Sequence, residues 1–206
     1  MKDKLVSKNE IKQVIEAFKE GKVIALPTET VFGIGVIYDN INAFNNLIIA
    51  KNRPLEKAFP LVIGDISWIN EFALLNKCQE KIIKTYFPGP LTVVLNKKDN
   101  VPYHVTSGKN TIAIRMPDDE FILKVLTNLN KPILLTSANK SGEKPARNHI
   151  EALDIFNDSV DMVVIGEAMF NVPSTIVDFT SDEIKLIREG VISFNDIERI
   201  YKEDEK

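Results

Sequence analysis

The sequence contains very few cysteines and histidines, and this scarcity excludes several kinds of site. Its 206 residues include one cysteine, Cys78, and two histidines, His104 and His149. One cysteine cannot form a disulfide framework within the chain, and cysteine–histidine spacings typical of zinc sites are missing. A serine hydrolase needs a histidine base and a GxSxG turn, and the sequence has no such turn. We interpret Cys78 as a structural or surface residue, and both histidines as surface residues.

Long apolar runs and glycine-rich phosphate loops are also missing. No segment approaches the ~18 apolar residues that span a bilayer. The N-terminal MKDKLVSKNE lacks the apolar stretch of a signal peptide. Neither GxxxxGK[ST] nor GxGxxG occurs. With 44% hydrophobic and 27% charged residues, the chain is expected to be a cytoplasmic protein without a membrane segment, with residues 1–206 forming one domain.

Basic charge is not in excess, and arginine is scarce. The net charge of −3 and the pI near 5.6 argue against a general nucleic-acid binder, although a local basic groove stays open. Only five of the 26 basic residues are arginines. A guanidinium offers a fixed fork of donors to carboxylate or phosphate that lysine lacks. The positions of the arginines are therefore informative: Arg53, Arg115, Arg147, Arg188 and Arg199.

Hydrophobic periodicity predicts short strands interleaved with helices. Expected strands cover 22–26, 31–38, 61–63, 91–95, 111–116, 133–135, 160–165, 175–179 and 184–187. A capping box at 7–10 predicts that a first helix follows it. Asp118 is expected to cap a helix that ends at about 130. Further helices are expected over 42–51, about 65–86, 150–156 and 194–201. Several strands follow one another without a helix, so the α/β fold is expected to contain a mixed, open sheet.

Polar segments interrupt this pattern where strands are expected to end. Taken singly, each has a plain explanation, such as turn hydroxyls that satisfy the backbone or basic residues at a helix end. Together they supply positive charges and hydroxyls but little acid. Ligands of open α/β sheets bind outside strand ends, so the combination suits a polyanion such as a nucleoside triphosphate.

Two of these segments predict opposite walls of a phosphate site. Lys51 and Arg53 are expected on an extended segment ended by Pro54, where both can converge on one anion. Ser137 and Asn139 alternate with Ala138, so both side chains are expected to face one way. We therefore predict a neutral wall of Ser137 and Asn139 opposite a positive wall of Lys51 and Arg53.

The ordered set of segments resembles the YrdC-like family, over about residues 10–195. The matching segments are PTETVFG (27–33), KNRP (51–54), FPGPLT (87–92), RMP (115–117), TSANKSG (136–142), PSTIVD (173–178) and REG (188–190). The best-known members of that family are threonylcarbamoyl-AMP synthases. The length resembles their short, single-domain bacterial form.

The resemblance implies both a fold and a reaction. The implied fold is a twisted, open α/β sheet with a deep, positively charged cavity. The implied reaction converts L-threonine, bicarbonate or CO2, and ATP into L-threonylcarbamoyladenylate and pyrophosphate. Mg²⁺ would accompany ATP, and no protein metal site is expected. The product would pass to a transferase that forms N6-threonylcarbamoyladenosine at position 37 of tRNAs reading ANN codons.

Site residues are carried over from the family by motif. The implied catalytic residues, which also bind ATP, are Lys51, Arg53, Ser137 and Asn139. The implied further ATP contacts are Lys57, Thr111 and Arg188. The implied threonine contacts are Thr30, Arg115 and Ser174, and an arginine suits a carboxylate because it can bind both oxygens.

Three positions depart from the family pattern, and two other functions stay open. Gly64 stands where longer members carry a threonine-contacting histidine, Phe32 replaces a common tyrosine, and Asp119 stands near a common histidine. We expect these changes to alter the threonine wall and the charge of the entrance. One alternative is an RNA- or ribosome-binding paralogue with a basic concave face. The other is a carbamoyl-adenylate site like that of hydrogenase-maturation carbamoyltransferases, whose acylphosphatase and zinc-finger parts are missing here.

Overall fold

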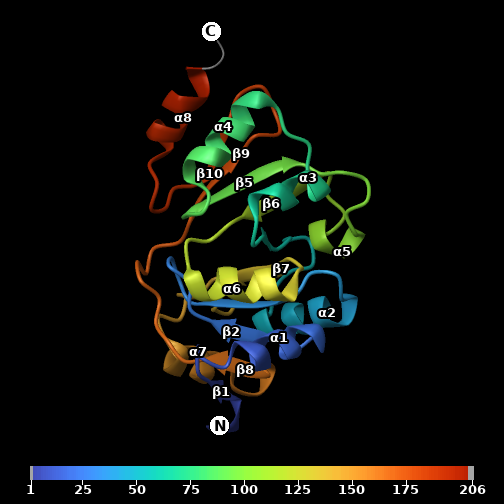
Figure 1. Cartoon of the computed structure of the whole chain (residues 1–206), viewed down its shortest axis with the longest axis vertical. Helices are drawn as coiled ribbons and strands as arrows, with labels where there is room; N and C mark the ends of the chain where they lie inside the picture. Colours follow the sequence, from blue (N-terminus) through green and yellow to red (C-terminus); the bar gives the residue numbers. More distant parts are fainter. Residues whose placement is uncertain (1, 204–206) are drawn as a thin grey trace.

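One mixed sheet runs through the length of the molecule in the computed structural model, which describes residues 2–203 (Figure 1). Its ten strands lie in the order β1-β8-β2-β3-β7-β4-β6-β5-β9-β10. They are β1 Leu5–Val6, β2 Ile24–Leu26, β3 Gly33–Ile37, β4 Leu61–Val62, β5 Leu91–Asn96, β6 Thr111–Arg115, β7 Ile133–Ser137, β8 Met162–Val164, β9 Thr175–Asp178 and β10 Lys185–Arg188. Strand pairs β1–β8, β2–β8, β4–β6 and β5–β9 are parallel and the other pairs are antiparallel. The expected mixed sheet is confirmed.

Helices are distributed over both faces of this sheet. They are α1 Ile11–Lys19, α2 Ile41–Lys51, α3 Ile69–Phe72, α4 Lys77–Tyr86, α5 Tyr103–Thr106, α6 Glu120–Leu129, α7 His149–Phe156 and α8 Phe194–Lys202. Short 3-10 turns cover Lys2–Lys4, Ile66–Trp68 and Asn157–Ser159. Within residues 2–203, none of the helices has both the length and the apolar character needed to cross a bilayer.

Two clusters of buried side chains form the core, one on each face of the sheet. Helices α1 and α6 pack on one face through residues such as Phe18 and Leu126, over β2, β7 and β8. The other cluster gathers side chains from α2, α4, α7 and α8. Figure 1 shows α1 and α6 beside β2 and β7, and α4 and α8 at the opposite end of the molecule, near β9 and β10. The face that α1 and α6 cover therefore continues onto β6, β5 and β9 without a helix.

Several predicted boundaries are wrong by a few residues, for local reasons. Strand β7 continues through Ser137, because Thr136 and Ser137 pair with β3. Helix α6 is capped by Asp119, whose Oδ1 accepts from the Ile122 amide at 3.0 Å, and not by Asp118.

Only half of the predicted capping box at the first helix forms. The Glu10 carboxylate accepts from the Ser7 amide at 2.8 Å, but the Ser7 hydroxyl accepts from Asn9, and α1 begins later, at Ile11. Strand β1 and helix α5 were not predicted from the sequence.

The single cysteine and the two histidines contribute to packing and to hydrogen bonding with the backbone. Cys78 is half-buried in α4 and packs against the core, in agreement with its structural interpretation. The prediction that both histidines lie on the surface is wrong, because each is half-buried and bonded to a backbone carbonyl. His104 Nε2 lies 2.8 Å from the Tyr38 oxygen, and His149 Nδ1 lies 3.0 Å from the Gly166 oxygen.

Thr175 fixes the end of β10 against the start of β9. Its buried Oγ1 accepts from the amides of Gly190 at 2.9 Å and Ile192 at 3.1 Å, and donates to the Ile192 carbonyl at 2.5 Å. Gly190 lies so close to this strand that an added Cβ would stand 2.1 Å from the Pro173 carbonyl oxygen. These contacts hold Arg188, two residues before Gly190, beside β9.

Replacing Thr175 by Val should destabilise the fold. The change keeps the shape of the side chain but leaves two part-buried amides without their acceptor, which costs about 1 kcal/mol. Urea denaturation of Thr175→Val should show this loss in the free energy of unfolding. The control is Thr85→Val, which removes an exposed hydroxyl on α4. Equal stability of the two variants would contradict this account of Thr175.

Candidate active site

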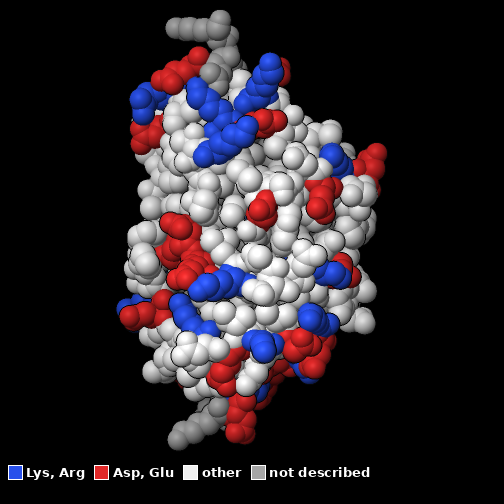
Figure 2. All heavy atoms as spheres, viewed as in Figure 1, with Lys and Arg blue, Asp and Glu red and all other residues white. Residues whose placement is uncertain are grey.

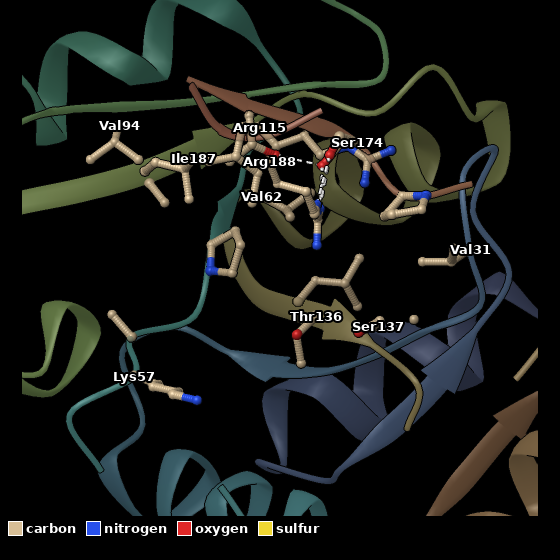
Figure 3. A pocket seen from close by; sticks show the side chains of 18 of the residues that line it. Val31, Lys57, Val62, Val94, Arg115, Thr136, Ser137, Ser174, Ile187 and Arg188 are labelled. Atoms are coloured by element: carbon tan, nitrogen blue, oxygen red, sulfur yellow. Dashed lines mark hydrogen bonds between the residues drawn. The ribbon is translucent and has the colours of Figure 1, made fainter. Parts of the chain in front are cut away.

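A cavity of about 480 Å³ lies on the part of the sheet that no helix covers (Figure 3). Residues from all seven polar segments line it. They are Thr28, Val31 and Gly33 of PTETVFG; Arg53 of KNRP; Thr92 of FPGPLT; Arg115 and Pro117 of RMP; Thr136 and Ser137 of TSANKSG; Pro173, Ser174, Ile176 and Asp178 of PSTIVD; and Arg188 of REG. Segments that lie far apart in the sequence thus build one site.

The alternation of strand side chains creates this wall. On β6, Thr111, Ala113 and Arg115 face the cavity, while Ile112 and Ile114 between them are buried in the core. Strands β5 and β9 alternate in the same way. The expectation that the site lies outside the strand ends is therefore wrong in part. Arg115, Ser137 and Arg188 do end strands, but the cavity spreads over the face of the sheet.

The cavity wall carries five basic side chains and one acidic side chain. The basic residues are Arg53, Lys57, Lys109, Arg115 and Arg188, and the acidic residue is Asp178. Figure 3 shows Lys57 on the opposite side of the cavity from Arg115, Arg188 and Ser174. The predicted residues Arg53, Lys57, Thr111, Arg115, Ser137, Ser174 and Arg188 all line the cavity.

Arg115 is held by a buried carboxylate that the sequence analysis did not predict. Its Nη2 donates to Glu29 Oε1 at 2.6 Å and to Thr30 Oγ1 at 2.8 Å. Arg115 is 9% exposed and Glu29 is 3% exposed, so the ion pair lies largely out of solvent. Thr30 is fully buried and does not line the cavity. Thr30 therefore does not reach the cavity directly, and its hydroxyl orients Arg115 instead.

Ser174 joins Arg188 to the floor of the cavity. Arg188 Nη2 donates to the Ser174 carbonyl at 2.9 Å and lies 3.3 Å from its hydroxyl. That hydroxyl lies 2.9 Å from Thr92 Oγ1, and both hydroxyls are buried. Desolvation lowers the pKa of Arg188, and the nearby charge of Arg115 lowers it further. The two guanidinium groups are thus close enough to repel each other.

Arg53 is fixed by its own loop. Its Nε donates to the Lys57 carbonyl at 2.8 Å and its Nη2 to the Ala58 carbonyl at 3.0 Å, and its guanidinium stacks 4.8 Å from the centre of the Phe59 ring. Desolvation lowers the pKa of Arg53. Lys57 itself is exposed at the cavity rim.

Lys51 does not share the wall with Arg53, so the predicted positive wall is wrong in this respect. Helix α2 continues through Lys51, and Asn52 caps it in the left-handed region at φ 48°, so the two side chains do not lie on one extended segment. Lys51 is 1% exposed. Its Nζ donates to the carbonyls of Ser137 at 2.5 Å and Asn139 at 2.6 Å, and to Asn139 Oδ1 at 3.2 Å. Desolvation, followed by the charges of Arg53 and Lys140, lowers the pKa of Lys51 to about 7.

Ser137 and Asn139 converge as predicted but have different roles. The Ser137 hydroxyl donates to Asn139 Oδ1 at 2.6 Å, so the two side chains do face each other. Ser137 lines the cavity, whereas Asn139 is buried and its Nδ2 donates to the carbonyls of Lys140 and Glu143. The predicted direct nucleotide contact of Asn139 therefore finds no support in this geometry. Asn139 organises the loop behind Ser137.

The three departures from the family pattern lie away from the cavity wall. Phe32 is fully buried in the core. Gly64 packs against α6, where an added Cβ would stand 2.7 Å from Leu126 Cβ. Asp119 caps α6 and lies 4.0 Å from the Lys8 ammonium. None of the three lines the cavity, so their effect on the threonine wall and on the entrance charge stays a prediction.

The polar residues of the site that were not predicted to act in it include Glu29, Thr92, Lys109 and Asp178. Glu29, Thr92 and Asp178 lie inside motifs that the sequence analysis had marked, so a search of those motifs for partners of Arg115 and Ser174 could have found Glu29 and Thr92. Lys109 lies outside the motifs and carried no signal.

Over residues 2–203, no group of three or more metal-ligating side chains is present. The cavity wall offers one carboxylate, Asp178, whose Oδ1 already accepts from Thr180. Mg²⁺ bound by protein alone needs more oxygen ligands than this. The wall therefore provides too few oxygen ligands to hold Mg²⁺ by itself.

Known proteins resemble this chain over most of its length. The family model Sua5_yciO_yrdC, described as telomere recombination, matches residues 16–190. A threonylcarbamoyl-AMP synthase of Pyrococcus abyssi is 36% identical over 90% of this chain, which spans only 55% of that protein's length. A putative threonylcarbamoyl-AMP synthase of Methanocaldococcus jannaschii is 33% identical over 94% of both chains. The crystal structure of P. abyssi Sua5 complexed with L-threonine superposes with a TM-score of 0.91, at 30% identity, over 95% of this chain and 60% of that one.

The lowered pKa of Lys51 predicts a pH-dependent stability. Between pH 7 and the ordinary lysine value of 10.5, the unfolded chain binds a proton that folded Lys51 has lost. The free energy of unfolding of the wild type should therefore rise relative to Lys51→Met as pH increases from about 7 to about 10. Denaturation at both pH values measures this difference. Lys124→Met, at an exposed ion pair, is the control and should show no such trend. If the free energy of unfolding of the wild type relative to Lys51→Met does not change with pH, the three oxygen acceptors keep Lys51 protonated.

Proposed function

Because the chain belongs to the Sua5/YciO/YrdC family, we propose that it is an L-threonylcarbamoyladenylate synthase, a nucleotidyltransferase. It forms threonylcarbamoyl-AMP and pyrophosphate from L-threonine, bicarbonate or CO2, and ATP. The observation that carries this proposal is the convergence of all seven family segments on one cavity. Its volume of about 480 Å³ lies within the range of about 300 to 1,000 Å³ that ligand pockets have.

Threonine binds at the Arg115 side of the cavity. Arg115 donates to its carboxylate and Ser174 to its polar groups, while Thr30 and Glu29 fix the guanidinium from behind. A positioned arginine is suited to this task because charge-assisted hydrogen bonds to a carboxylate are about twice as strong as neutral ones. The α-amine stays free for reaction with CO2.

ATP occupies the rest of the cavity, with its phosphates toward Arg53 and Lys57. Arg188 and the Ser137 hydroxyl add donors from the other walls, and Thr111 contacts the nucleoside. Mg²⁺ enters as part of the ATP substrate and neutralises phosphate charge. Lys51 and Asn139 act from behind the wall, because they hold the loop that presents Ser137.

The reaction then needs positioning more than a dedicated side-chain base. The threonine amine adds to CO2 and releases a proton, which gives a carbamate. A carbamate oxygen attacks the α-phosphorus of ATP, a P–O bond forms, and the bond to the β-phosphate breaks to release pyrophosphate. Negative charge develops on the leaving pyrophosphate, where Arg53 and Lys57 stabilise it electrostatically. Holding both substrates in one cavity contributes through proximity.

The product defines the next partner. A mixed carbamic–phosphoric anhydride is reactive, so a threonylcarbamoyl transferase acting on tRNA must consume it in the same cytoplasmic compartment. The proposal includes direct RNA binding only through a local group of basic side chains. Figure 2 shows Lys and Arg interspersed with Asp and Glu over the visible face, with a group of basic side chains near the end that carries α4 and α8.

Loss of Arg53 tests the proposed function. Pyrophosphate release from ATP in bicarbonate buffer should depend on L-threonine, and Arg53→Ala should reduce kcat/KM about 100-fold, as does loss of a donor to developing charge. Arg147→Ala is the matched control, because Arg147 forms an exposed ion pair with Glu151 outside the cavity. Full activity in Arg53→Ala would contradict the assigned role. Absence of threonine-dependent turnover in the wild type, together with tight RNA binding, would favour the RNA-binding alternative.

A further inference from the structure

Glu29 is a buried acid that the proposed reaction does not use directly. Its Oε1 accepts from Arg115 at 2.6 Å and from the Asp118 amide at 3.1 Å, while Oε2 is buried without a hydrogen-bond partner. The amide of Phe170 donates to the Glu29 backbone carbonyl at 2.9 Å, so the main chain is fixed too. Glu29 lies behind the cavity wall and not in it.

This ion pair makes the charge of the wall asymmetric. In the part of the chain that the structure describes, Arg115 is the only one of the five wall cations with a carboxylate within 4.0 Å. Arg53 and Arg188 are held by carbonyl oxygens, which leave their charge uncompensated. The loop after α2 therefore presents positive charge without a carboxylate partner, whereas on the other side, where Arg115 and Arg188 lie together, one of the two guanidinium charges is paired with a carboxylate behind the wall.

We propose that Glu29 is a positioning residue that determines specificity: by neutralising Arg115, it makes this side of the cavity select a zwitterionic α-amino acid and reject simple anions. The inference rests on the proposed function for its choice of L-threonine as the amino acid. The substrate carboxylate meets Arg115, and the substrate ammonium gains from the field of the Glu29 carboxylate. In a site shielded from water, charges a few ångströms apart interact much more strongly than in bulk solvent.

The proposed reaction explains why the site would need to reject simple anions. ATP, pyrophosphate and bicarbonate are all anions present at the site, and Arg115 lies close enough to Arg188 to lower its pKa. Without Glu29, the two guanidinium groups would form an anion site that phosphate or carboxylate groups could fill in place of threonine. Specificity of this kind depends on weakening the wrong complex as well as on strengthening the right one.

A purely structural role for the Glu29–Arg115 ion pair predicts a different result. Loss of one partner from a buried pair destabilises the fold, and both roles share that outcome. Only the specificity role predicts that loss of the acid increases the affinity for anions. Affinity for an anion without an amine is thus the measurement that separates the two.

The test compares three variants by calorimetry, with L-threonine, 3-hydroxybutyrate and inorganic phosphate as ligands. 3-Hydroxybutyrate is threonine without its amine. In Glu29→Gln, the Kd of 3-hydroxybutyrate and of phosphate should fall at least about tenfold relative to wild type, and the Kd of L-threonine should rise about tenfold. Glu29→Asp keeps the charge and should keep the wild-type preference. Glu120→Gln is the control, because it removes the same charge from an exposed side chain.

Three results would overturn the proposal. They are unchanged anion affinity in Glu29→Gln, equal anion gains in Glu29→Gln and Glu120→Gln, and a wild type that binds 3-hydroxybutyrate as tightly as L-threonine. If Glu29→Gln does not fold, the test uses the affinities of the wild type and Glu29→Asp. The proposal requires both proteins to bind 3-hydroxybutyrate at least about tenfold more weakly than L-threonine. A wild type without threonine turnover, combined with an anion gain in Glu29→Gln, would remove the proposed function and leave the selection by Glu29 standing.

Discussion

The site depends on one buried contact, the ammonium of Lys51 against the carbonyls of Ser137 and Asn139. Lys51 is the last residue of α2. Ser137, at the end of β7, and Asn139, just after it, follow Lys51 by 86 and 88 residues in the sequence. The Lys51 carbonyl accepts from the Ser141 amide at 3.0 Å, and Lys140 Nζ donates to the Ala50 carbonyl at 2.6 Å, so the contact is reciprocal. Because Arg53 follows this helix end and Ser137 ends this strand, the contact sets how the basic loop stands relative to the neutral wall.

From this anchor, the chemistry divides along the cavity. The loop after α2 supplies cations without carboxylate partners, which suit a triphosphate. The ends of β6 and β10 and the residue before β9 supply Arg115, Arg188 and Ser174, where one guanidinium is already paired with Glu29. The reaction proposed above joins an amino acid to a nucleotide and needs two such unlike regions beside each other. The twisted sheet provides them because the cavity extends over neighbouring strands from β3 to β10.

Local sequence signals were enough to predict most of the strands and the motifs, but not the contacts between them. Alternating side chains such as Thr92 between Leu91 and Val93 report which residues of a strand face the core. Nothing local reports that Glu29 meets Arg115, because the pair forms only when β3 and β6 are placed in the same sheet. The same holds for Lys51, whose position at a helix end suggested a free cation until the carbonyls of a distant loop surrounded it.

The scarcity of arginine finds a physical explanation in this arrangement. Arg53, Arg115 and Arg188 line the cavity, whereas Arg147 and Arg199 form exposed ion pairs with Glu151 and Asp196. Burial brings the pKa of Lys51 down from 10.5 to about 7, so a lysine in a desolvated part of the wall would lose much of its charge. Burial also lowers the pKa of Arg53 and Arg188, but from a much higher ordinary value, and a guanidinium stays charged.

The lysines of the wall, Lys57 and Lys109, are both exposed at its rim. The division between the two basic residues thus follows solvent exposure. Positive charge that must persist against the sheet is arginine, and positive charge at the mouth can be lysine. In a chain that otherwise uses lysine, an arginine at a strand end or after a helix therefore marks a cation that has to function in a desolvated place.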